Sequence, residues 1–502
     1  MIEMLTLIPD LHTKNKFYQE NTLISLSARL QEENVDNQLL LLDDETDQFL
    51  ANFMGTKPKV IYLFDEIRGI ETDGSPLTLK DLNIPDNYKL ETLIYLSGTQ
   101  VEVFDEQTRV MEVVMGGSGE LKLVTYYEEA GQIVDRYDLR GFRSSRSYFN
   151  EQGQLISKEW FNATSDLVMT QNEDLTITIP TRQQSRFQKS QYTNLAEIEC
   201  EFALPYLTGK QKLLIEPSQE SLAFRHFLLQ AQVYYYFTEY NQVANLDYHI
   251  VVQQDQYLFE NETLAHLFFD KLKQNDIDFV PIWHIIPPYF NDFSLGTSME
   301  QEEQVIYWHV GQIGNDELLK CFCELIDLLK ENENLRIMAD ADLQYASFFK
   351  AVSADWVARF KDKLSEIDDV DSLDEVDTTN LDVDQIEALD RFACPENATY
   401  EQKLPILRQA HIFIDTDPVT NYELQLEAVK TGIPQIVYQS NNLIKEGKNG
   451  FLIKQKGEIK KPVEVFLTNL DKWNVAVVEN VRLIQRMSLR MVINQWKRVL
   501  QG

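Results

Sequence analysis

The sequence predicts an α/β protein of two lobes, each built on a parallel sheet, with an antiparallel β-meander inserted into the first lobe. Short apolar segments alternate with amphipathic segments of helical period in both halves of the chain, as expected of parallel strands joined by helices. Between them lies a stretch of alternating polarity with glycines at its turns, which is typical of hairpins. The 502 residues exceed what one hydrophobic core can hold, so several domains are expected.

The first lobe should open with a strand–helix–strand unit, which begins a parallel sheet. Apolar runs at 4–8 and 38–42 predict buried strands, and apolar residues at helical spacing predict a helix over 21–33. The alternation resumes after residue 204. There we expect strands at 212–216, 247–252 and 279–285 and helices at 222–240 and 261–275.

Three stretches starting at Val103, Tyr127 and Phe149 repeat one pattern: an aromatic strand end, a polar turn and an alternating strand. Gly131 and Gly153 occupy equivalent turns, where a hairpin demands the positive φ that glycine tolerates. We interpret residues 55–195 as an antiparallel meander inserted into the first lobe. A free-standing β domain is the alternative.

The second lobe repeats the alternation of strands and helices. Strands are expected at 304–310, 335–338, 411–415 and 435–438, helices at 316–331 and 422–430, and one long amphipathic helix at 475–499. The concentrated acidic run at 365–390 predicts a solvated loop or a dock for a basic partner.

Composition excludes several classes of function. The formal net charge of −34 opposes binding to nucleic acid and to anionic lipid. The first residues lack a basic segment followed by a long apolar one, and no apolar run is long enough to span a bilayer. Four cysteines without a disulfide framework fit a reducing compartment. We therefore expect a cytoplasmic protein that partners could recruit to the inner face of the membrane.

The segment 421–453 carries the most specific pattern. A helix containing Glu427 is followed by Gly432-Ile-Pro434, an apolar strand and Gly447-Lys-Asn-Gly-Phe-Leu. This order resembles the donor-lobe signature of GT-B glycosyltransferases. The resemblance implies a GT-B-like fold of two Rossmann-like lobes. Its division would be 1–54 and 196–290 for the first lobe, 55–195 for the insert, 291–474 for the second lobe, and 475–502 for a helix that crosses back to the first lobe.

An active enzyme of that class needs fixed positive charge to hold a nucleotide diphosphate. Its usual setting, Gly-Arg-x-x-x-x-Lys, corresponds here to the segment that begins at Gly311, where Gln312 replaces the arginine and Glu317 the lysine. Each charged hydrogen bond contributes about 1.5–3 kcal/mol, so losing two should weaken donor binding by roughly 10²–10⁴-fold. The first lobe also lacks a glycine-rich loop after its opening strand.

The start of the helix at Thr420 points the same way. Thr420 and Glu423 have the spacing of a capping box, which would satisfy the helix N–H groups internally, and Asp415 and Asp417 lie just upstream. The partner that the paired-glutamate motif expects before Glu427 is a valine. We predict a vestigial donor cleft without catalytic residues, metal or cofactor, made of the following residues: Gly311, Gln312, Glu317, Thr420, Glu423 and Glu427. His249 and His284 are interpreted as core or interface residues.

A second stretch, Tyr137–Gln154, narrows the family. Its Asp…Arg-Gly-Phe-x-Ser-Ser…Tyr…Gly hairpin is similar to the inserted meander of proteins from the accessory Sec locus of Gram-positive bacteria. With the length, the acidity and the dismantled donor site, the chain resembles the first family of accessory secretory (Asp) proteins. The resemblance implies a non-catalytic export factor for glycosylated serine-rich-repeat adhesins.

The implied partners are the other two Asp proteins, the accessory Sec motor ATPase and the adhesin itself. Two alternatives remain open. One is the non-catalytic, acceptor-binding subunit of the adhesin O-GlcNAc transferase, which shares the scaffold. The other is an active GT-B glycosyltransferase.

Overall fold

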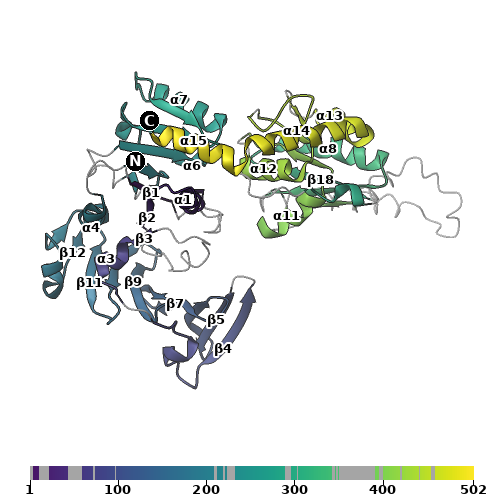
Figure 1. Cartoon of the computed structure of the whole chain (residues 1–502). Helices are drawn as coiled ribbons and strands as arrows, with labels where there is room; N and C mark the ends of the chain where they lie inside the picture. Colours follow the sequence, from purple (N-terminus) through teal and green to yellow (C-terminus); the bar gives the residue numbers. More distant parts are fainter. Residues whose placement is uncertain are drawn as a thin grey trace, which may run out of the picture.

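The structure is a computed structural model of the whole chain, in which two lobes lie side by side and a β-sheet extends from the first lobe (Figure 1). It describes residues 4–10, 22–42, 59–71, 74–95, 98–207, 212–218, 221–222, 232–288, 295–301, 303–341, 345, 349, 391–394, 400–418, 421–439, 441–453 and 458–501. The acidic run at 365–390 and Thr420 lie outside these residues.

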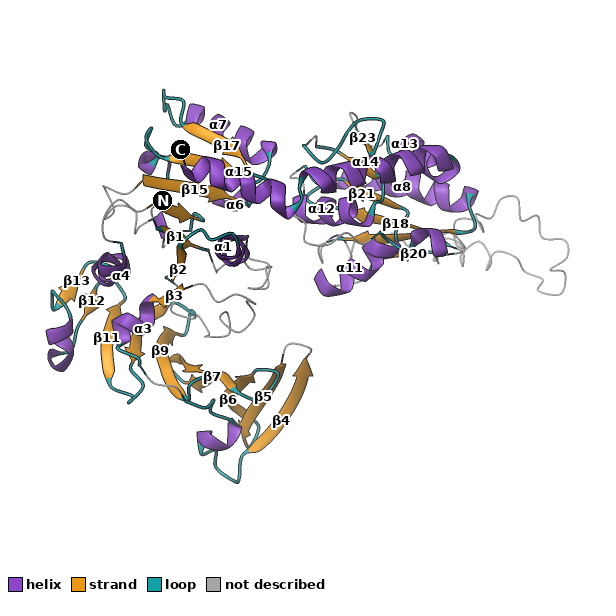
Figure 2. Ribbon diagram, in the orientation of Figure 1, coloured by secondary structure: helices purple, strands orange, loops and turns teal. Residues whose placement is uncertain are grey.

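A seven-stranded parallel sheet forms the centre of the first lobe, in the order β17-β16-β15-β14-β1-β2-β3 (Figure 2). Its strands are β1 (Leu5–Ile8), β2 (Asn37–Leu41), β3 (Lys59–Tyr62), β14 (Lys212–Ile215), β15 (Gln232–Phe237), β16 (Gln256–Phe259) and β17 (Ile282–Ile285). Helices α6 (Tyr240–Ala244) and α7 (Glu262–Gln274) pack on one face, and α1 (Thr22–Glu32) packs on the other. Most of these strands are buried throughout, which is typical of a parallel sheet covered on both faces.

Two expectations for the first lobe were wrong. Residues 232–237 form strand β15 and not the end of a helix, because this aromatic and β-branched run is buried between two layers and shows no polar face. The segment 247–252 forms the 3₁₀ turn η5 (Tyr248–Ile250) and not a strand. There the Asp247 side chain accepts a hydrogen bond from the His249 N–H, a local bond that competes with pairing in a sheet.

The antiparallel sheet is a ten-stranded meander whose strands follow one another in sequence order from β4 to β13. They are β4 (Lys89–Tyr95), β5 (Gly98–Asp105), β6 (Thr108–Met115), β7 (Leu121–Glu128), β8 (Gly131–Asp138), β9 (Phe142–Asn150), β10 (Leu155–Phe161), β11 (Leu167–Asn172), β12 (Ile177–Thr178) and β13 (Gln191–Tyr192). Gly131 and Gly153 have φ values of +141° and +74°, as their hairpin turns require. Strand β3, which lies in the range expected for the insert, instead forms the edge of the parallel sheet.

The sheet joins the first lobe through Arg140, the arginine of the hairpin motif. Its guanidinium donates to both carboxylate oxygens of Asp65 (2.8 and 2.9 Å) on helix α3 (Leu63–Arg68) and to both oxygens of Asp138 (2.7 and 2.6 Å). Strands β10 to β13 and helix α4 (Leu195–Ala203) share the core of the first lobe, whereas strands β5 to β7 have a small core of their own. The motif is therefore an anchor between sheet and lobe.

The second lobe has a six-stranded parallel sheet in the order β20-β19-β18-β21-β22-β23. Its elements are β18 (Gln304–His309), α8 (Asn315–Glu331), β19 (Leu335–Asp340), β20 (Phe392–Ala393), α11 (Tyr400–Gln409), β21 (Ile412–Asp415), α12 (Tyr422–Thr431), β22 (Gln435–Val437) and β23 (Gly450–Leu452). The expected alternation of this lobe is confirmed. Gly432 has a φ of +81° and caps α12, so strand β22 can follow at once.

The chain ends in helices α13 (Lys460–Thr468), α14 (Leu470–Arg486) and α15 (Leu489–Gln501). The single helix expected over 475–499 is thus two helices, which separate at Met487-Ser488 because α14 packs on the second lobe and α15 on the first. Figure 1 shows α15 crossing between the lobes. The buried Trp496 lies edge-on against Tyr236 of β15, with 5.0 Å between the ring centroids. No helix among the described residues is long and apolar enough to cross a membrane.

Candidate functional site

The candidate site lies where the strand order of the second sheet reverses. The chain proceeds outward from β18 to β19 and β20, then returns to the other side of β18 as β21. In open α/β sheets, ligands bind at the carboxyl ends of the strands beside such a switch point. Here three adjacent strands end in His309, Asp340 and Asp415, which the parallel register places side by side.

His309 is the centre of a network of carboxylates. Its Nδ1 lies 3.1 Å from Asp340 Oδ2, and its Nε2 lies 3.8 Å from Asp417 Oδ2. Asp340 also accepts hydrogen bonds from Tyr307 Oη at 3.0 Å and from Lys403 Nζ of α11 at 2.7 Å. The side chains of His309, Asp340 and Asp417 are all less than 15% exposed, so the strand ends meet in a nearly closed charged cluster.

Asp415 is buried under the start of α12 and holds that helix in place. Its carboxylate accepts hydrogen bonds from the backbone N–H of Asn421 at 3.2 Å and from the Gln425 side chain at 2.8 Å. It also accepts from the backbone N–H of Asp417 at 3.0 Å. These bonds place a negative charge under the helix N-terminus, where a bound phosphate would otherwise lie.

The surroundings shift the pKa values of His309, Asp340 and Asp415. Burial alone would lower the pKa of His309, but its hydrogen bonds to Asp340 and Asp417 outweigh burial and raise the pKa to about 10. Burial would raise the pKa of Asp340, yet the charge and hydrogen bonds of His309 and Lys403 lower it to about 2. For Asp415 burial prevails and raises the pKa to about 6. His309 is therefore a cation at neutral pH, balanced by its own carboxylates.

In the loop after β18, a carboxylate of the chain again accepts a backbone N–H group. Gly311 has a φ of +65°, and a Cβ added there would lie 2.2 Å from the Cβ of Asp417. Asp417 Oδ1 accepts the backbone N–H of Gln312 at 3.3 Å. A carboxylate of the chain itself thus uses a backbone donor that a phosphate would need.

The other described residues of the predicted cleft lie on helices α8 and α12. Glu317 lies in the first turn of α8, where its charge complements the helix dipole. The N-cap of α12 is Asn421, whose side chain accepts from the Leu424 N–H at 3.1 Å, so the cap expected at Thr420 is displaced by one residue. Glu423 is exposed in the first turn of that helix. Glu427 pairs with Lys430 on the same helix and is not part of the network.

Sequence reasoning found Asp415 and Asp417 but missed His309, Asp340 and Lys403. The signal that could have found them is a polar residue directly after an apolar strand. His309 follows a tyrosine–tryptophan pair, and Asp340 follows an apolar run. Because parallel strands end at one edge of a sheet, such residues are expected to converge.

The corresponding switch point of the first lobe is also acidic. Between β1 and β14, the backbone N–H of Asp10 donates to Glu216 Oε2 at 3.0 Å, and both residues are buried. Each sheet therefore presents carboxylates at the position where a dinucleotide-binding sheet presents N–H donors. Among the described residues, no group of three or more side chains is arranged to hold a metal ion.

Two parallel-sheet lobes, a switch-point site in the second lobe and a last helix that returns to the first define a GT-B glycosyltransferase-like protein. A family model matches residues 27–502, and it describes an accessory Sec system protein, the first of the Asp proteins. The chain belongs to this family. Two curated proteins of the same description are 22% identical: that of Staphylococcus aureus (strain NCTC 8325 / PS 47), covering 99% of this chain and 96% of its own, and that of Streptococcus gordonii, covering 88% and 84%.

Solved structures share the fold along the full length. The glycosylation associate protein (Gap123) complex from Streptococcus agalactiae gives a TM-score of 0.73 at 16% identity, covering 98% of this chain and 99% of that one. Accessory secretory protein 1, 2 and 3 of Streptococcus pneumoniae gives 0.71 at 16%, covering 99% of both. The pneumococcal O-GlcNAc transferase GtfA, in complex with UDP and GlcNAc, gives 0.65 at 12%, covering 99% and 98%. The chain is a glycosyltransferase-like component of the accessory Sec system.

Proposed function

We propose that this protein is a non-catalytic member of the accessory Sec pathway, required for the export of glycosylated serine-rich-repeat adhesins. It would act in the cytoplasm, together with the other two Asp proteins and the motor ATPase, and could reach the membrane through them. Family membership supports the pathway. The similarity to two solved assemblies of Asp and Gap proteins supports the other two Asp proteins as partners. The motor and the adhesin rest on the sequence resemblance.

The observation that supports the non-catalytic role is the closed network at the carboxyl edge of the second sheet. A nucleotide diphosphate brings two or more negative charges, and it would meet Asp340, Asp415 and Asp417 with His309 already paired. The Gln312 N–H is bonded to Asp417, and Glu317 adds a further negative charge. Binding a donor would require breaking these bonds and repelling these charges.

Calorimetric titration with UDP-GlcNAc and UDP-glucose tests this role. We expect no binding tighter than millimolar, because two charged phosphate contacts are missing and each is worth about 1.5–3 kcal/mol. The pneumococcal transferase that was solved with UDP serves as the positive control. A micromolar affinity, or turnover of either sugar donor, would contradict the proposal.

The transferase-subunit alternative rests on the sequence resemblance and is supported by the fold that this chain shares with the O-GlcNAc transferase GtfA. Affinity purification from the native organism separates the two. Recovery of Asp proteins with the motor supports export, whereas recovery of a glycosyltransferase alone supports the alternative. We further propose the domain division given above, with the insert starting after β3 and not at residue 55, since β3 pairs with β2.

A further inference from the structure

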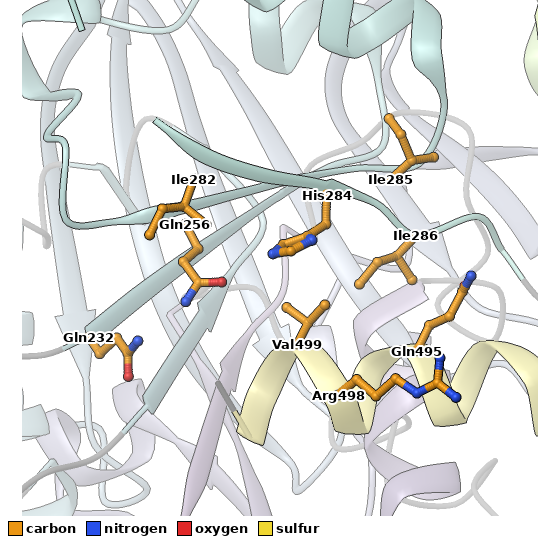
Figure 3. A pocket seen from close by; sticks show the side chains of 9 residues that line it. All are labelled: Gln232, Gln256, Ile282, His284, Ile285, Ile286, Gln495, Arg498 and Val499. Carbon is orange, nitrogen blue, oxygen red and sulfur yellow. The ribbon is translucent and has the colours of Figure 1, made fainter. Parts of the chain in front are cut away.

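A pocket lies in the first lobe, whereas the switch-point network belongs to the second lobe. It is a cavity of about 580 Å³ between the amino ends of strands β15 to β17 and the last turns of α15 (Figure 3). Three glutamines, one histidine and one arginine surround an aliphatic floor. The lining residues are Gln232, Gln256, Ile282, His284, Ile285, Ile286, Gln495, Arg498 and Val499.

The pocket exists because α15 covers only part of its face of the sheet. Side chains alternate between the faces of a strand, and the register places Gln256 and Ile282 on the same face as Tyr234. Trp496 packs on Tyr236 in the middle of this face, but the start of β16 and the edge strand β17 remain beyond the helix. Ile282 is 52% exposed as a result, although parallel sheets are usually covered on both faces.

Gln256 supplies a side-chain amide to the wall of the pocket. Its residue is only 8% exposed, and its side chain points into the pocket in Figure 3. Within the described parts of the chain, this side-chain amide makes no hydrogen bond. The amide atoms of Gln256 are not among the described polar atoms that are enclosed without a partner, so they face the open pocket and offer one acceptor and two donors to whatever enters.

Arg498 supplies the charge at the other side of the pocket. It lies in the last turn of α15, and among the residues that the structure describes no carboxylate pairs with it, whereas its neighbour Lys497 is bonded to Glu33. Arg498 therefore brings a positive charge to the pocket in a chain whose net charge is −34. A planar guanidinium suits a carboxylate of the ligand.

Strand β17 adds an open backbone edge beside the pocket. It is the last strand in the described sheet, and Ile286 just after it donates its N–H to Phe259 of β16. By alternation, the backbone groups of Trp283 and Ile285 face away from β16. Pro281 and Pro287 limit this edge to a few residues, so it can pair with a short segment but not with a long strand.

We propose that this pocket binds a short extended segment of a partner protein, in which an aliphatic residue stands next to an aspartate or glutamate. The aliphatic side chain packs on Ile282 and Val499, the carboxylate pairs with Arg498, and peptide groups bond to Gln256 and to the edge of β17. A small free carboxylate would use Arg498 alone and leave the glutamine and the open edge without partners. This site is separate from the switch-point network and does not depend on the proposed export role.

A positional-scanning library of acetylated, fluorescent pentapeptides, titrated against the full chain by fluorescence polarisation, tests the proposal. We expect selection of Ile, Val or Leu at one position and of Asp or Glu beside it. For the best peptide, Arg498→Gln should weaken binding by roughly ten- to a hundredfold, the range of a charged hydrogen bond. Gln256→Leu preserves the side-chain volume but removes the amide, and it should also weaken binding of this peptide.

Arg490→Gln is the matched control, because Arg490 is an exposed arginine of the same helix that does not line the pocket. It should leave the affinity unchanged, and the melting temperature of each variant verifies folding. The proposal is overturned if no peptide binds, if selection shows no acidic preference, if acetate competes as well as the peptide, or if Arg490→Gln weakens binding as much as Arg498→Gln.

Discussion

At the scale of single residues, the switch point of the second lobe is filled by carboxylates of the chain itself. Asp415 and Asp417 accept the N–H groups of Asn421 and Gln312, and His309 supplies the countercharge that an enzyme of this fold would need for its donor. Such a cluster is stable only while every member keeps its partner, because a buried charge left alone is strongly unfavourable.

Replacing His309 tests the cluster through its pH dependence. At pH 7, His309→Gln should lower the free energy of unfolding by about 3–5 kcal/mol, since it removes the cation that lies between Asp340 and Asp417 and leaves Asp340 paired with Lys403 alone. The folded-state pKa of about 10 lies above the usual value, so the contribution of His309 is full below about pH 6.5 and is lost as the pH rises through 10. Urea unfolding of both proteins at pH 7, 8.5 and 10 should show the difference shrinking. A difference that does not change with pH would contradict a charged His309.

At the scale of elements, the hairpin motif attaches the meander to the first lobe. Arg140 is 6% exposed and bonds to two carboxylates, of Asp65 on α3 and Asp138 on the sheet itself. Gly141, next in the motif, has a φ of +88°, and a Cβ there would lie 2.2 Å from the carbonyl oxygen of Ser75. The residues that suggested a family from sequence are thus those that join two parts of the fold.

Arg140→Gln should destabilise this junction by about 3–5 kcal/mol, because it removes the close hydrogen bonds of a buried guanidinium to Asp65 and Asp138 and leaves both carboxylates with the longer contacts to Arg68. Thermal unfolding and limited proteolysis around residues 71–75 would detect the change. The control is Arg182→Gln, which removes an exposed ion pair with Asp166 near the same sheet and should cost less than about 1 kcal/mol. Equal effects of the two substitutions would show that the anchor is unimportant.

Helix α15 is expected to be indispensable for the first lobe. Ending the chain after Met487 would expose the sheet face that contains Leu5, Tyr236 and Leu258 and should cause aggregation, measurable by light scattering. Trp496→Ala should cost about 3–5 kcal/mol, since Trp496 is fully buried. Met491→Ala on the exposed face of the helix should have little effect. A truncated protein that stays monomeric with unchanged melting would refute this role.

The fold was largely predictable because its repeating signals are local. Apolar runs with helical or alternating spacing located most strands and helices of both lobes, and Gly131, Gly153 and Gly432 marked turns whose φ values are indeed positive. The misassigned strand β15 is an aromatic run buried on both faces, for which periodicity carries no information. The break at Met487 could not be predicted, since it depends on which lobe each helix contacts.

The site was predictable only in part. Gln312 and Glu317 stand out where a phosphate-binding arginine and lysine are expected, and this needs only the sequence. The partnership of His309 with Asp340 requires the register between β18 and β19, which joins residues 31 positions apart. The contact of Asp417 with Gly311 and Gln312 could not be predicted, because only the folded sheet brings these two loops together.

At the scale of the whole molecule, the parts combine into a scaffold of surfaces. Two lobes tied by α15 and a ten-stranded sheet extending from the first give a large area for protein contacts (Figures 1 and 2). The cargo proposed above, an adhesin rich in serine repeats, would remain extended and offer little apolar surface, so handling it would require several weak sites that act together. Such a scaffold can provide those sites without any catalysis.

The charge of −34 predicts how partners associate with this scaffold. Long-range attraction raises the association rate for a partner with a basic face and is screened by salt, so the rate should fall steeply between 50 and 500 mM NaCl while the dissociation rate changes little. Surface plasmon resonance with the other two Asp proteins measures both rates. Met491→Ala serves as a control, because it alters an exposed side chain without changing the charge and should have little effect on folding. An association rate that is independent of salt would show that shape and apolar contact, not charge, bring the partners together.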